Sequence, residues 1–179
     1  MKAKGKFLNL EKNTKTNQIK KEIISYFLNN GKTTISELAK ELDLSVPTVT
    51  KLINGMSEDG LISDYGKIPT PEGRHPNYYG MNPTSAYFMG IEMTHQHLNM
   101  ALMDFNGDVV RTKFGIPYIY ENKLELLDEL CTRIMEFIDE ETPEIRENIF
   151  NINLNIAGRV NPESGYSYSS FYFSEEPIS

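Results

Sequence analysis

Few features of this sequence suit secretion, membrane insertion or a metal cluster. Its 179 residues include a single cysteine, Cys131, which excludes an intrachain disulfide and an all-cysteine zinc site within one chain. No apolar run approaches the roughly 18 residues that a membrane-spanning helix needs. The basic N-terminus lacks the continuous apolar segment of a secretory signal. We therefore expect a cytoplasmic protein that makes no contact with a membrane.

The net charge of −7 is distributed unevenly along the chain. Residues 1–80 hold 12 lysines and arginines against 9 acidic residues, whereas residues 81–179 hold 6 against 16. A polyanion is therefore attracted to the first part of the chain and repelled by the second. The positive excess is small, so charge alone does not decide whether the protein binds nucleic acid.

Two short amphipathic helices joined by a tight turn form the most specific pattern in the sequence. Thr34 followed three residues later by Glu37 predicts a capping box at the start of the first helix. Ser45 is a good N-cap for the second helix, Pro47 fits its first turn, and Gly60 suits a left-handed stop. This arrangement predicts a helix-turn-helix, whose second helix docks in a DNA major groove. The helices are expected at 34–43 and 46–59, with apolar stripes of Ile35, Leu38, Ala39 and Leu42 and of Val49, Leu52, Ile53 and Met56.

A further helix and a β-hairpin flank this pair and predict a winged helix-turn-helix domain over residues 17–82. The lysine-rich N-terminal arm is either a solvated tail or a phosphate contact beside the DNA site. The domain ends at Asn82, because the proline that follows pushes this residue out of helical geometry. The expected segments are a flexible basic arm at 1–16, a helix at 17–30, and strands at 61–65 and 75–81 around a loop at 66–73.

The remaining residues predict three strands, a helix and a fourth strand. Asn106-Gly107 is a strong signal for a tight hairpin between the second and third strands. The helix is expected to be amphipathic, with Leu127 in its apolar stripe, and Pro143 is expected to follow its end. Cys131 is expected to lie on an apolar stripe of this helix and to be inert. Several strands would expose an apolar face without a further partner. The strands are expected at 87–94, 97–105, 108–116 and 148–157, the helix at 122–141, and a short additional strand at 171–173.

Three groups of residues together resemble the ROK family of bacterial regulators and sugar kinases. The first is Gly-Arg-His-Pro at 73–76 with Tyr-Gly-Met-Asn-Pro at 79–83, similar to the family's exit from the wing. The second comprises 87–92 and 101–107, similar to its first two kinase-lobe strands. The third, at 156–162 with Gly165 behind it, is similar to a conserved glycine turn. The resemblance extends from about residue 18 to 179.

This resemblance implies a mixed α+β and α/β fold with two domains. The winged helix-turn-helix at 17–82 is followed at 84–179 by the first part of an actin-like (ribonuclease H-like) sugar-kinase lobe. The family's sugar-binding residues, catalytic aspartate and zinc cluster normally lie beyond residue 179. We therefore expect the chain to be the N-terminal part of a longer regulator, or a truncated relative.

One departure from the family bears on enzymatic activity. The kinase branch holds ATP phosphates in an Asp-x-Gly-Gly-Thr turn, where glycine lets phosphate approach the backbone closely. The equivalent residues 92–97 read Glu-Met-Thr-His-Gln-His and contain no glycine. We therefore expect no ATP binding, no kinase activity and no cofactor.

The candidate DNA contacts lie on the second helix of the helix-turn-helix and on the wing. Hydroxyls and an amide early in such a helix can read base edges, and a lysine can reach a guanine or a phosphate. Arg74 could enter a narrow minor groove, or could form a salt bridge or remain in solvent. The alternative for the helix is ordinary surface polarity. The candidate residues are Ser45, Pro47, Thr48, Thr50, Lys51, Asn54, Lys67 and Arg74.

Two other groups of residues are weaker candidates. His95 and His97 would share one strand face, but no third ligand is near them, so no metal site is predicted. The aromatic residues of 166–173 are either a sugar-stacking surface or ordinary hairpin packing.

The sequence therefore predicts a sequence-specific transcriptional regulator, a repressor of carbohydrate-metabolism genes. Its expected partners are a double-stranded DNA operator, a second copy of the chain, and a sugar or sugar-phosphate effector. Two alternatives stay open. One is a ROK-type sugar kinase with an accessory N-terminal domain, and the other is a winged-helix module that binds protein.

Overall fold

The computed structural model describes Leu10 and residues 13–67, 76–94, 96–119, 124–156, 159–164 and 167–169. It divides into two compact units. The first unit comprises residues 1–86 together with 104–108, and the second comprises 87–103 and 109–179. Each unit has a hydrophobic core of its own. In the described residues, no helix is both long enough and apolar enough to cross a membrane.

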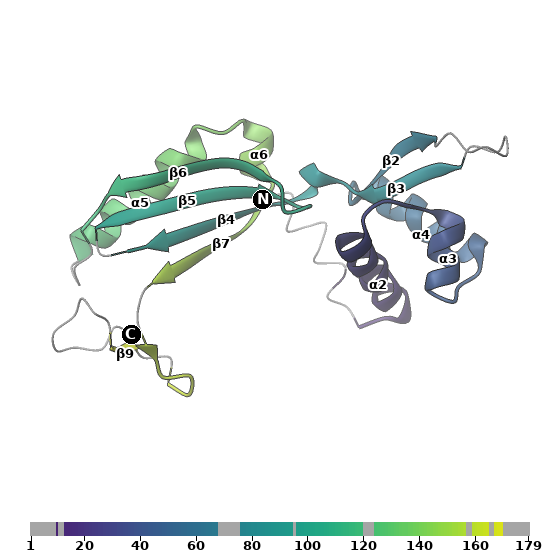
Figure 1. The fold of residues 1–179 in the computed structure, drawn as a ribbon, viewed down its shortest axis with the longest axis horizontal. Helices are drawn as coiled ribbons and strands as arrows, with labels where there is room; N and C mark the ends of the chain where they lie inside the picture. Colours follow the sequence, from purple (N-terminus) through teal and green to yellow (C-terminus); the bar gives the residue numbers. More distant parts are fainter. Residues whose placement is uncertain are drawn as a thin grey trace. The chain divides into compact units, whose positions relative to one another are not determined.

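The first unit is a three-helix body with a small antiparallel sheet (Figure 1). The helices are α2 (Lys15–Asn30), α3 (Ile35–Glu41) and α4 (Val46–Glu58), and the strands are β1 (Thr33–Thr34), β2 (Ile62–Lys67) and β3 (Asn77–Met81), in the order β1-β3-β2. The predicted winged helix-turn-helix is confirmed. Helix α2 starts two residues earlier than predicted, because Thr14 is its N-cap and accepts the Asn17 N–H at 3.2 Å.

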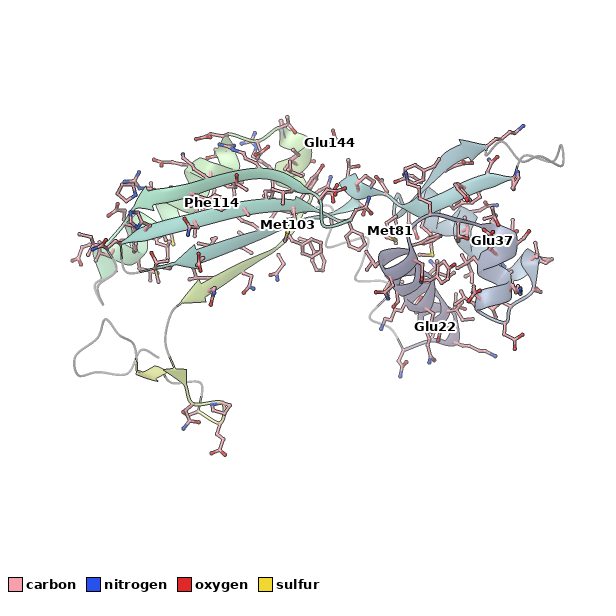
Figure 2. The ribbon with its side chains drawn as sticks, viewed as in Figure 1. Glu22, Glu37, Met81, Met103, Phe114 and Glu144 are labelled. Carbon is pink, nitrogen blue, oxygen red and sulfur yellow. The ribbon has the colours of Figure 1, made fainter. Side chains whose placement is uncertain are left out.

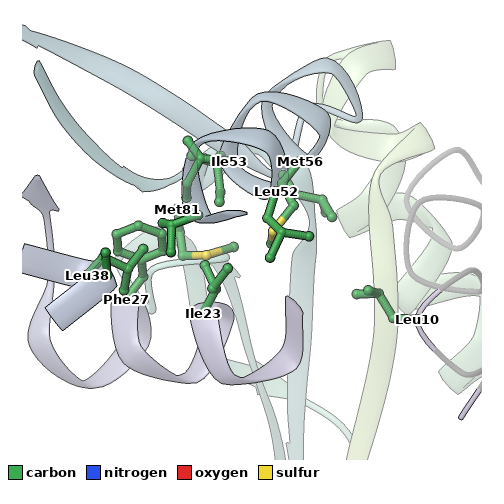
Figure 3. Packing of buried hydrophobic residues seen from close by; sticks show 12 residues of the cluster. Leu10, Ile23, Phe27, Leu38, Leu52, Ile53, Met56 and Met81 are labelled. Atoms are coloured by element: carbon green, nitrogen blue, oxygen red, sulfur yellow. The ribbon is translucent and has the colours of Figure 1, made fainter. Parts of the chain in front are cut away.

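Large side chains from all three helices and from the wing meet in the core of the first unit (Figure 3). Ile23 and Phe27 come from α2, Leu38 from α3, Ile53 from α4 and Met81 from β3, and each is almost completely buried. The period of these residues along each helix is what the sequence predicts. Burial of this stripe orients the opposite face of α4 away from the core.

Tyr65 of β2 contacts both β3 and the segment between α2 and β1. Its hydroxyl donates to the Met81 carbonyl at 2.7 Å, and the Lys32 ammonium lies 3.5 Å from the centre of its ring. Gly80 permits this approach, because a Cβ there would lie 2.9 Å from Lys32 Cγ and 3.1 Å from Tyr65 Cε2. A side chain at residue 80 would have to displace one of these two groups.

The second unit is built on a four-stranded sheet in the order β6-β5-β4-β7. Strands β5 and β6 pair antiparallel, and β4 and β7 pair parallel. Leu130 and Phe137 of α5 pack with buried residues of β4 and β5, so this helix covers one face of the sheet (Figure 1). The bounds are β4 (Tyr87–Met93), β5 (His97–Asp104), β6 (Val109–Pro117), α5 (Leu124–Asp139), α6 (Pro143–Glu147) and β7 (Ile149–Ile156), followed by a pair of short strands, β8 (Arg159–Val160) and β9 (Ser167–Ser169).

The hairpin predicted at Asn106-Gly107 is present, and its tip belongs to the first unit. Gly107 has φ 88°, and Asp104 Oδ1 accepts the N–H groups of Asn106 at 2.8 Å and Asp108 at 3.0 Å. Phe105 packs against the core of the first unit and donates its N–H to Pro83 O at 3.1 Å.

The expected positions of Leu127 and Cys131 on α5 are corrected. Pro143 follows the end of α5, as expected, and it also begins the unpredicted helix α6, with Thr142 as its N-cap, because proline fits a first turn. Leu127 is 53% exposed and Cys131 is also exposed, since the helix turns Leu130, Ile134 and Phe137 toward the sheet instead. The strand predicted at 171–173 lies outside the described residues.

Candidate nucleic-acid interface

Local hydrogen bonds fix the start of α4. Ser45 Oγ accepts the Thr48 N–H at 3.3 Å, and Pro47 occupies the first turn, where its missing N–H is not needed. The turn before it places Asp43 in the left-handed region, with φ 51°, and Leu44 donates its N–H to Ala39 O at 2.9 Å. These short-range contacts set the angle at which α4 leaves α3.

The two faces of α4 differ as the sequence predicts. Val49, Ile53 and Met56 are completely buried and Leu52 nearly so. The predicted contact residues lie outside this stripe. Ser45, Pro47, Thr48, Lys51 and Asn54 are exposed and Thr50 is half-buried.

The hydroxyl groups on this helix are engaged locally, whereas the longer polar side chains are not. Thr50 Oγ1 donates to Val46 O at 2.8 Å, and the Ser45 and Thr48 hydroxyls lie 2.7 Å apart in a mutual hydrogen bond. Lys51 and Asn54 form no side-chain hydrogen bond or ion pair with any residue that the structure describes. These two side chains are therefore free to bind a partner without breaking an internal contact.

A shallow hollow runs along the side of α4 that faces away from the core. Its wall, which we call the outer face of α4, is formed by Val46, Pro47, Thr50, Lys51, Asn54, Gly55 and Glu58. The sequence reasoning missed Val46, Gly55 and Glu58. Val46 lies four residues before Thr50, Gly55 four after Lys51, and Glu58 four after Asn54, and this spacing on one side of a helix could have identified them.

Among the described residues of the wing, one is a candidate DNA contact. Lys67 is exposed at the end of β2, just beyond an irregularity in the pairing of β2 with β3. Asp64 shapes this irregularity by accepting the Gly66 N–H at 2.8 Å and the Asn77 side-chain amide at 2.6 Å, and Gly66 has φ 83°. Arg74 and His75 lie outside the described residues.

The capping box links the helix-turn-helix to the wing sheet. Glu37 Oε2 accepts hydrogen bonds from the Thr33 hydroxyl at 2.8 Å, the Thr34 hydroxyl at 3.0 Å and the Thr34 N–H at 3.2 Å (α3 and Glu37 are visible in Figure 2). These donors lower the pKa of Glu37, the Thr33 hydroxyl most. Because Thr33 pairs with Tyr79 of β3, the ionised carboxylate ties α3 to the wing.

The turn that corresponds to the kinase phosphate loop is closed on itself. Thr94 Oγ1 donates to His97 O at 2.9 Å and accepts the His97 N–H at 3.1 Å, and the Glu92 carboxylate accepts the Asn99 amide at 2.9 Å. His95 lies outside the described residues, as do all of 166–173 except the short strand β9. Across the described residues, no group of three His, Cys, Asp or Glu side chains is arranged to hold a metal ion.

Comparison with known proteins extends this geometry. Residues 16–63 match the family model described as "Winged helix-turn-helix DNA-binding". The fold matches a solved structure described as "Crystal structure of the ROK family transcriptional regulator, homolog of E.coli MLC protein", with a TM-score of 0.61 and 20% identity over 87% of this chain and 39% of that one. At this identity the likeness shows that the two chains share a fold.

Curated proteins similar to this chain carry the name of a repressor. It is 25% identical to "Xylose repressor" of Caldicellulosiruptor bescii over 80% of this chain and 36% of the relative. It is 20% identical to "Xylose repressor" of Bacillus subtilis over 83% of this chain and 38% of the relative. The chain thus spans less than half the length of these curated relatives.

Proposed function

We propose that this chain is the DNA-binding part of a transcriptional repressor and that the outer face of α4 enters the major groove of its operator. The observation that carries the proposal is this face, on which Lys51 and Asn54 are exposed and hold no partner among the described residues. A major groove about 12 Å wide admits one helix, and lysine and asparagine match the acceptor and donor edges of guanine and adenine there.

The wing would add contacts to the sugar–phosphate backbone. Lys67 stands at the end of β2, where a cation can neutralise a phosphate without reading a base, and Arg74 remains a candidate for the minor groove. One such module gives limited affinity. A homodimer that places two of them on half-sites one helical turn apart would supply the specificity of a repressor.

Control by a sugar or sugar phosphate is the second part of the proposal. It is supported by two relatives named for xylose repression and by the kinase-like sheet that follows the wing. The closed turn at Thr94 disfavours the sugar-kinase alternative, because the His97 N–H that could meet a phosphate is already held by the Thr94 hydroxyl. Coupling requires that the effector bind two states of the protein with different affinity.

Mapping of DNA occupancy across the source genome tests the proposal, with the whole protein in cells grown with and without xylose and other sugars. The expected result is a small set of sites beside carbohydrate-use genes, whose occupancy falls when one sugar is present. Occupancy spread without preference for sequence would contradict it.

A titration of the purified chain with duplex DNA at several salt concentrations distinguishes the proposed DNA-binding function from the remaining alternative, a winged-helix module that binds protein. A protein that contacts phosphates loses affinity linearly in log salt, with a slope set by the number of contacts. Absence of any salt-dependent duplex binding would favour a module that binds protein instead.

A further inference from the structure

Gly55 occupies a position in α4 where nothing in the described part of the chain requires a glycine. It lies in the last turn of the helix, four residues before the C-cap Asp59, and its φ is not in the left-handed region. A Cβ built on Gly55 would meet no atom within 4 Å apart from the helix's own backbone and its chain neighbours. Neither backbone conformation nor internal packing therefore explains the missing side chain.

A glycine inside an exposed helix weakens that helix relative to alanine, because it has more backbone freedom to lose on folding. Gly80 shows the contrast in the same unit, since a Cβ there would press on Lys32 and Tyr65. No described residue accounts for Gly55, and one use of glycine is to let another backbone come close.

The surroundings of Gly55 indicate what approaches it. Gly55 lines the same hollow as Lys51, which lies one helical turn earlier on the same side, and Asn54, which is its neighbour. Lys51 supplies an unpaired positive charge next to the open position. Glu58 borders the hollow further along and repels anions, so an anionic group would lie toward Lys51.

We infer that Gly55 is a close-approach position, at which the sugar–phosphate backbone of duplex DNA comes against α4, with its phosphate toward Lys51. This inference rests on the proposed function and sharpens it. It assigns the side of α4 at Lys51 and Gly55 to the DNA backbone and leaves Asn54 to face the base edges.

Two substitutions at Gly55 give opposite effects on folding and on binding. Gly55→Ala and Gly55→Gln both favour the helix, so each raises the thermal midpoint of the first unit by about 3 °C. Both place atoms where the DNA backbone would lie. We expect duplex affinity to fall about threefold for alanine and about tenfold or more for the longer glutamine.

The salt dependence of binding provides a readout that a purely structural role would not change. Neither substitution alters charge, so a shallower slope of log affinity against log salt reports phosphate contacts that have been lost. Ser25→Ala on the exposed side of α2 is the matched control. It also strengthens a helix of the first unit, and it leaves affinity and slope unchanged.

The experiment uses the whole chain and a duplex enriched from a random-sequence pool by the wild-type protein, in parallel with the unselected pool. If the wild type binds but both Gly55 variants keep its affinity and slope while gaining stability, the close-approach assignment is wrong and the proposed function stands. If the wild type binds neither duplex at any salt concentration, the proposed function fails and the assignment fails with it.

Discussion

The two units of this chain differ in how completely they cover their apolar residues. In the first unit the exposed large hydrophobic residues of the described part are few and scattered, namely Leu28, Val46 and Tyr65. In the second unit they are numerous and lie on both edge strands, just after β6 and on α5, namely Val109, Val110, Phe114, Ile119, Leu127, Met135, Ile152 and Leu154. Figure 2 shows Phe114 on β6, where its side chain is 67% exposed.

The difference shows that the two units depend on different kinds of contact. Three helices and a wing are enough to close the first core around Ile53 and Met56. The second unit is a sheet with α5 over one face, and its outer strands β6 and β7 have free edges within the described sheet. Exposed apolar surface of this extent is typical of a surface that another protein segment covers.

The largest expected effect separates the two cores directly. Ile53→Ala removes a completely buried side chain and should destabilise the first unit by about 3 kcal/mol, since a cavity remains. Hydrogen exchange measured peptide by peptide should show faster exchange in α2, α3 and α4 and unchanged exchange in β4 and β5. Asn54→Ala, at the exposed neighbouring position, is the matched control. Equal loss of protection in both units would show that they fold as one.

The next effect concerns charge. Lys51→Ala should weaken duplex binding about tenfold and reduce the salt slope by about 1 if Lys51 contacts a phosphate. Lys113→Ala is the charge-matched control in the second unit, where this lysine is 3.5 Å from Glu140. Fluorescence anisotropy with a labelled duplex measures both variants. If the two substitutions weaken binding equally, the basic surface acts through net charge and not through α4.

A smaller effect follows from the capping box. The pKa of Glu37 is lowered from its ordinary value of 4.5, so the ionised carboxylate stabilises the folded first unit. This contribution is fully present above pH 4.5 and is lost as the pH falls through the lower pKa of the folded state. Urea midpoints measured at several pH values should therefore differ between wild type and Glu37→Gln at neutral pH, and should converge in acid. Thr33→Val removes the hydroxyl that lowers the pKa most and should narrow this difference. If the difference in urea midpoint between wild type and Glu37→Gln persists unchanged into acid, the ionised carboxylate of Glu37 does not stabilise the folded unit.

The smallest effect on stability is expected at the exposed stripe of α5. Leu127→Ser combined with Met135→Ser should change the unfolding free energy by no more than about 0.5 kcal/mol per site, because both side chains are more than half exposed. The same variant should associate less with itself or with other proteins, as sedimentation velocity would show. Leu130→Ser, one turn along and almost completely buried, should instead destabilise the second unit strongly. Strong destabilisation by the double variant would show that the stripe is covered.

Features set by neighbours three or four residues apart were predictable. The capping box at Thr34 and Glu37 and the N-cap at Ser45 depend only on local spacing, and so does the buried stripe of α4. Where one residue type serves two local purposes, prediction failed. Helix α6 was missed because Pro143, which was expected only to follow a helix, also begins one. Leu127 was assigned to the apolar stripe because its spacing fits nearly as well as that of the residues that pack on the sheet.

The candidate site was predictable in outline. The polar side of α4 follows from the spacing of its apolar residues, since a helix that buries one stripe must present the other. Which polar groups remain available did not follow. Thr50 bonds to the Val46 carbonyl and Thr48 to Ser45, and only coordinates separate these engaged hydroxyls from the free Lys51 and Asn54. The open space at Gly55 likewise could not be predicted from the sequence.

The amino-acid sequence by itself determined where the helices of the first unit begin, which of their faces is apolar, and where the hairpins turn, because caps, helical period and turn residues act over a few positions. The tertiary structure alone decided the parallel pairing of β4 with β7, the approach of Lys32 to Tyr65 over Gly80, and the side of α5 that meets the sheet. These contacts join residues far apart in the chain, and their geometry depends on the packing of whole elements, which no local pattern encodes.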